Sequence, residues 1–149
     1  MAVKSASVVH YPGELDHLVV PQDGAIVCCG IFGVFEHSGI WIDNNIIELR
    51  GNGLIRGISP VRFLQNRSGN TIHLLCDSNM KPLIDPQTVT RAVARLYEYS
   101  EYHVLRNNCH NFVWQCVSGN NALISSFYDL NQALSRHFAC TLSWCKTTV

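Results

Sequence analysis

The chain contains one clear helix start, and a cysteine lies at it. Residues 107–117 read NNCHNFVWQCV, in which two amides precede Cys109 and apolar residues then recur at helical spacing. Asparagine caps helix N-termini and glycine ends helices, so we predict a helix from Cys109 to about Ser118-Gly119. Free N–H groups and the helix dipole lower the pKa of a thiol in a first turn. Cys109 is therefore a candidate nucleophile, although core packing is the simpler interpretation of an arbitrary buried cysteine.

Size and composition narrow the class of protein. The 149 residues suffice for one domain, and 11 basic against 11 acidic side chains leave no net charge to attract nucleic acid. We therefore expect no nucleic-acid partner. The longest uncharged apolar run, residues 25–35, is about half of the roughly 20 residues that a membrane-spanning helix needs. Seven cysteines without a framework of even spacing are typical of reduced thiols, so we expect a cytoplasmic protein without an integral membrane segment.

The order of the expected elements predicts an α+β fold of residues 1–149 as a single domain. Strand-like runs come first and amphipathic helices follow, so we expect a small antiparallel sheet packed against helices. Its core would span about residues 20–138, after an irregular lead-in at 1–22. The expected strands are 25–35, 37–42, 45–49 and 71–76, and the expected helices are 87–99, 109–118 and 125–137.

A nucleophilic thiol needs a base within hydrogen-bond reach, usually a histidine. His110 adjoins Cys109, but neighbouring positions on a helix project about 100° apart. His37 begins an expected strand after a buried one, beside Ser38-Gly39, where small residues let a helix approach a sheet closely. His37 is therefore the candidate base.

Two short segments resemble a known protein family. Residues 36–43, EHSGIWID, resemble the histidine-box strand of the lecithin retinol acyltransferase-like proteins, and residues 108–113, NCHNFV, resemble their Asn-Cys-x-x-Phe box. Residues 23–27 also resemble the lead-in strand of that family, and the similarity covers about residues 20–120. These proteins belong to the NlpC-like superfamily, in which histidine precedes cysteine, as His37 precedes Cys109 here. The resemblance implies a permuted papain-like fold.

The resemblance also implies a mechanism. His37 would take the proton of Cys109, and the thiolate would attack a carbonyl to form a thioester, which water or an acceptor resolves. The backbone N–H of Cys109 would help to hold the oxyanion. The expected function is a cysteine-dependent hydrolase or acyltransferase acting on an acyl, amide or thioester bond, without a cofactor. The alternative is a catalytically inactive module of the same fold with a binding or regulatory role.

The third catalytic position depends on hairpin register. The family places a polar residue on the next strand, and Glu48 matches it. If Asp43-Asn44 form the turn, Glu48 lies diagonal to His37 on the same face, within side-chain reach. If the turn slips by one residue, Asn52 comes opposite His37 instead. A carboxylate both orients an imidazole and stabilises its protonated form, whereas an amide can only orient it, so we predict Glu48 and keep Asn52 as the alternative.

The chain departs from the family pattern at two places. Trp41 replaces the usual tyrosine of the histidine strand, which removes a hydroxyl from the oxyanion site, and His110-Asn111 replaces the usual Glu-His pair. No C-terminal membrane helix is evident either. We therefore expect a small-molecule, acyl or peptide substrate, hydrolysed in solution, rather than acyl transfer to retinol or phospholipid. The residues carry no signal for an oligomeric state.

A structural metal site is the remaining alternative. It would use Cys28, Cys29, Cys140 and Cys145. Adjacent strand residues point to opposite faces of a sheet, however, so Cys28 and Cys29 cannot form the paired half of a zinc site. We expect no bound metal.

Overall fold

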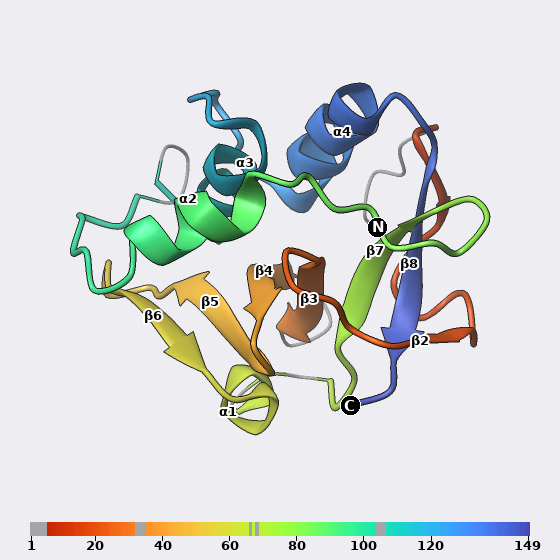
Figure 1. Cartoon of the computed structure of the whole chain (residues 1–149), viewed down its shortest axis with the longest axis horizontal. Helices are drawn as coiled ribbons and strands as arrows, with labels where there is room; N and C mark the ends of the chain where they lie inside the picture. The colour runs from red at the N-terminus through yellow and green to blue at the C-terminus, as the bar shows by residue number, and fades with distance from the viewer. Residues whose placement is uncertain (1–5, 32–34, 66, 68, 104–106) are drawn as a thin grey trace.

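The computed structural model describes residues 6–31, 35–65, 67, 69–103 and 107–149, and it has a mixed α and β architecture. Within these ranges, eight strands form one sheet in the order β1-β8-β7-β3-β4-β5-β6, with β2 also paired to β8. Figure 1 shows α2, α3 and α4 together on one side of the sheet and α1 on the other. This agrees with the predicted α+β class.

The elements have the following bounds. The strands are β1 Val8–His10, β2 Leu18–Val19, β3 Ile26–Ile31, β4 Phe35–Ile42, β5 Asn45–Leu49, β6 Ile55–Ile58, β7 His73–Asp77 and β8 Leu142–Thr147. The helices are α1 Pro60–Leu64, α2 Thr88–Ala94, α3 Cys109–Ser118 and α4 Phe127–Phe138.

The predicted hairpin at residues 37–49 is confirmed, with its turn at Asp43 and Asn44. Both turn residues have positive φ angles, 50° and 59°, as the two-residue hairpin turn of type I′ requires. Ile42 pairs with Asn45 and Ile40 with Ile47, so the register is the one that brings position 48 towards His37.

Two predicted elements have different bounds. The apolar run 25–35 is not one strand: β3 ends at Ile31 and pairs antiparallel with β4, which already begins at Phe35. Residues 32–34 lie outside the described residues. A continuous apolar run does not reveal where a buried strand reverses, because both strands of such a hairpin are buried.

The helix predicted over residues 87–99 ends at Ala94. The chain beyond it pairs with β6, where the N–H of Tyr97 donates to the carbonyl of Ile55 and the N–H of Ile55 donates to the carbonyl of Glu98. Tyr97 has a positive φ of 68°, which is incompatible with a continuing helix. Hydrogen bonds to a distant strand therefore override the local helical pattern.

The sheet is larger than expected, and it is mixed rather than wholly antiparallel. The segment after the last helix forms β8, which pairs antiparallel with β7 and parallel with β1 and β2 from the lead-in. Its Trp144 is fully buried, and the indole N–H donates to Asn131 of α4 over 3.0 Å. Segments near both ends of the chain thus form one edge region of the sheet.

Two buried clusters hold the sheet between its helices. One joins the sheet to α3 and α4 through residues such as Phe112, Val113 and Leu130, and the other packs Phe63 of α1 beneath β3, β4 and β5. Burial of each large apolar side chain contributes about 1.5–3 kcal/mol, which fixes α3 against β4. No helix within the described ranges is long and apolar enough to cross a membrane.

Candidate active site

Helix α3 places Cys109 in its first turn, as predicted. Asn108 is the N-cap, with an extended backbone, and its side-chain oxygen accepts a hydrogen bond from the N–H of Asn111 over 2.8 Å. The Asn108 amide also donates to the buried carbonyl of Ile124 over 2.8 Å. Gly119 ends the helix with a φ of 73°. The cap is therefore tied to the core on both sides, which holds the backbone of Cys109 in place.

His37 lies in β4 opposite Cys29, beyond the last residue pair between β4 and β5. Its ring stacks on Phe63, with centroids 5.1 Å apart, and only 5% of the residue is exposed. Nε2 lies 2.7 Å from Oε1 of Glu48. An ionised carboxylate can only accept, so Nε2 carries the proton, and the other ring nitrogen is the one left for the hydrogen bond with Cys109.

Glu48 is almost fully buried and links two basic side chains. One carboxylate oxygen accepts from His37, and the other accepts from Nε of Arg56 over 2.9 Å. Burial alone would raise the pKa of Glu48, but the hydrogen bonds and charges of His37 and Arg56 hold it below its usual value. The amide of Asn52 instead accepts from the N–H of Leu54 inside its own turn. The geometry therefore brings Glu48, and not Asn52, to His37.

The thiol and the imidazole shift one another's pKa values in opposite directions. Burial opposes both charged forms, yet His110 and His37 together lower the pKa of Cys109 well below that of an ordinary thiol. For His37, burial is outweighed by hydrogen bonds to Cys109 and Glu48, which raise its pKa to about 9. Each group therefore favours the charged form of the other, and the two titrate as a coupled pair.

The other cysteines have pKa values above the ordinary value rather than below it. All seven are free, and in the six besides Cys109 burial raises the pKa of the thiol, to about 12 for Cys29 and Cys116. Cys109 is the one cysteine whose environment favours the thiolate. Within the described part of the chain, no cluster of three or more His, Cys, Asp or Glu side chains could hold a metal ion.

His110, set aside above as the base, also acts on Cys109. Its Nδ1 lies 2.8 Å from the hydroxyl of Ser38 on β4, and its ring lies against Phe127 of α4. From there its charge and hydrogen bond act on the thiol of Cys109. An angle of 100° between neighbouring helix positions does not by itself keep two side chains from interacting. Adjacency of His110 and Cys109 in the sequence was therefore itself the signal.

A tyrosine hydroxyl from the segment before α3 also lies near Cys109. An antiparallel bridge between His103 and Asn107 folds the chain back, so that Tyr102 comes beside the helix start. The hydroxyl of Tyr102 lies near the backbone N–H of Cys109, which acts to lower the pKa of that hydroxyl. Trp41 supplies no hydroxyl, but Tyr102 brings one near Cys109 from another segment. Burial and the nearby Cys109 charge raise the pKa of Tyr102, which keeps it protonated.

Comparison with known protein families places most of the chain in one family model. A family model described as lecithin retinol acyltransferase matches residues 3–122, a range that contains the histidine strand, its hairpin and the whole of α3. No curated protein and no solved structure matches the chain significantly. Helix α4 and strand β8 lie beyond the matched range.

Proposed function

Because the chain belongs to the lecithin retinol acyltransferase family, whose membership suggests acyltransferase or hydrolase activity, we propose that it is a thiol enzyme with Cys109 as nucleophile. His37 is the proposed base, and Glu48 the residue that orients it. One observation carries the proposal: Glu48 bonds His37 over 2.7 Å, and His110 and His37 act on Cys109 at the N-terminus of α3 and hold its pKa well below the ordinary value. The order of His37 and Cys109 along the chain also supports a permuted papain-like fold.

The reaction proceeds in two steps. The Sγ thiolate attacks the carbonyl carbon, the C–S bond forms, and the carbonyl π electrons move to oxygen. When the tetrahedral intermediate collapses, the bond to the leaving group breaks, and the imidazolium of His37 gives that group its proton. In the second step His37 removes a proton from water or from an acceptor. The oxygen or other nucleophilic atom of that molecule attacks the thioester carbonyl, the C–S bond breaks, and Cys109 leaves as the thiolate.

The developing oxyanion has two candidate donors. One is the backbone N–H of Cys109, and the other is the hydroxyl of Tyr102, which lies near that N–H. A hydroxyl can donate as well as accept, so Tyr102 can turn its proton towards the oxyanion when charge develops. Each such donor commonly contributes about 3 kcal/mol to lowering the barrier.

We expect the substrate to be a soluble amide, peptide or thioester. The alternative function, a binding or regulatory module without turnover, is favoured by one observation: Cys109 is only 6% exposed, so substrate reaches the sulfur only if the site opens.

Trapping of the acyl-enzyme separates these functions. The protein is mixed with an acyl ester, a peptide anilide and an acyl thioester, quenched in acid within seconds, and analysed by intact mass and peptide mapping. We expect an acyl adduct on Cys109 with at least one substrate, and none in Cys109→Ala. Cys140→Ala is the matched control, because Cys140 is a more exposed thiol with a raised pKa. Unacylated wild-type protein across the whole panel would favour the binding module.

A further inference from the structure

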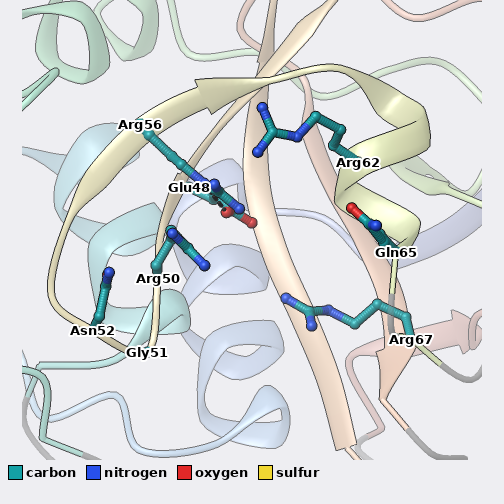
Figure 2. A pocket seen from close by; sticks show the side chains of 8 residues that line it. All are labelled: Glu48, Arg50, Gly51, Asn52, Arg56, Arg62, Gln65 and Arg67. Atoms are coloured by element: carbon teal, nitrogen blue, oxygen red, sulfur yellow. Dashed lines mark hydrogen bonds and ion pairs between the residues drawn. The ribbon is translucent and has the colours of Figure 1, made fainter.

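A cavity of about 370 Å³ lies on the α1 side of Glu48, and arginines dominate its wall. Arg50 lies in the turn after β5 and Arg56 in β6, whereas Arg62 lies in α1 and Arg67 in the segment after it. Figure 2 shows these side chains directed from both walls towards the space in front of Glu48. The chain as a whole is neutral, yet four of its 11 basic residues line this one cavity.

The single carboxylate of the cavity does not neutralise these arginines. Glu48 is bonded to His37 through one oxygen and to Arg56 through the other, so both of its oxygens are occupied. Four positive charges and one negative charge leave the lining with a formal charge of +3. Among the described residues, no ion pair involves Arg50, Arg62 or Arg67.

One of these arginines has a buried donor without a partner. Nε of Arg67 is inaccessible to solvent and has no hydrogen-bond acceptor among the described residues, although the guanidinium also contacts the thiol of Cys29. A buried N–H without an acceptor is unfavourable, and like charges that converge on one space repel each other. An anion in the cavity offsets the repulsion between the guanidinium groups.

We propose that this cavity is a binding site for the phosphate group of a small ligand or substrate. Guanidinium forks bind carboxylate and phosphate oxygens in pairs, and a planar carboxylate has only two oxygens to offer. The three guanidinium groups without an ion pair come from two walls and together offer more donors than the two oxygens of a carboxylate can accept, whereas a phosphate has three or four acceptor oxygens. The proposal concerns binding alone, so a test of binding decides it whether or not Cys109 is catalytic.

Nuclear magnetic resonance of the arginine side chains tests the site in the whole chain. The Nε–Hε signals are followed while inorganic phosphate is titrated at constant ionic strength, with chloride and acetate as reference anions. We expect saturable shifts of the Arg56 and Arg67 signals with phosphate, weaker shifts with acetate, and none beyond ionic strength with chloride. Equal responses to phosphate and chloride would overturn the proposal.

Variants show whether the response comes from this cavity. Arg62→Gln removes an exposed guanidinium and Arg50→Gln a half-buried one, so the fold should tolerate both changes. Each loss should weaken phosphate binding about tenfold, because a charge-assisted hydrogen bond corresponds to about that factor in affinity. Arg136→Gln, on the exposed last turn of α4, is the matched control and should bind as the wild type does. Unchanged binding in the Arg50→Gln, Arg62→Gln double variant would refute the assignment.

Two further arms distinguish the source of the phosphate. Glycerol 3-phosphate represents a soluble monoester, and phosphatidylcholine vesicles that contain phosphatidic acid, tested by co-sedimentation, represent a lipid headgroup. A response in either arm that the double variant loses supports the cavity and identifies the source. If single-stranded RNA binds while inorganic phosphate and both monoesters do not, the proposal is wrong, because the ligand is then an extended polyanion.

Discussion

Replacement of Glu48 by glutamine should lower the pKa of His37 while leaving the fold in place. The pKa of this imidazole is about 9, against 6.5 for an ordinary histidine, although the ring is buried. At about 1.4 kcal/mol for each tenfold change, the rise corresponds to about 3 kcal/mol in favour of the imidazolium. Cys109 and Glu48 are its two sources. A charge-assisted hydrogen bond contributes about 1.5–3 kcal/mol, so Glu48→Gln should move the midpoint down by about 1–2 pH units.

The direction of the effect follows from which form Glu48 stabilises. Its carboxylate favours the protonated ring, so the wild-type imidazolium persists until the pH rises through about 9, and the variant should lose it nearer neutrality. Histidine ring resonances, assigned with His37→Gln, report the midpoint directly. Asn52→Ala is the control, because that side chain bonds within its own turn and should leave the titration unchanged. A Glu48→Gln variant that titrates like the wild type would show that Glu48 does not act on His37.

Three other changes test separate parts of the account. Tyr102→Phe should lower the rate of acylation by about 10²-fold or more, as loss of an oxyanion donor does, without changing the pKa of Cys109; an unchanged rate would remove Tyr102 from the oxyanion site. His110→Gln should raise the pKa of Cys109 by about one unit, read from the pH dependence of alkylation, and no change would contradict its role. Gly39→Ala should destabilise the fold by about 1–3 kcal/mol in urea unfolding, because a Cβ there would lie 2.6 Å from Cγ2 of Ile46, whereas Gly51→Ala, in open space, should not.

Local signals predicted the parts of the site that the chain itself encodes. The amide before Cys109 predicted the helix start, because a cap is a property of neighbouring residues. The Asp43-Asn44 turn predicted the hairpin and its register, and this register brings Glu48 to His37. The helix start and the hairpin register each depend on a short stretch of consecutive residues.

Interactions between distant segments could not be predicted in this way. The contact of Tyr102 with Cys109 depends on how the chain folds back before α3, which no periodicity encodes. Helix α2 stops early because residues beyond it bond to β6. The arginine cavity combines residues of two hairpin strands with those of a short helix, and a neutral overall composition conceals such a local concentration of charge.

The pH dependence of alkylation tests the central claim most directly, namely that His37 converts Cys109 into a thiolate. Wild type and His37→Gln are treated with iodoacetamide across the pH range, and each cysteine is followed by peptide mass spectrometry. We expect Cys109 to react at its full rate well below the ordinary thiol pKa of about 8.5 and to lose part of this advantage in His37→Gln, where His110 still acts on the thiol. Burial can slow the reaction at every pH, but it does not move the midpoint downwards. A midpoint for Cys109 near 8.5 that is the same in both proteins would contradict the account.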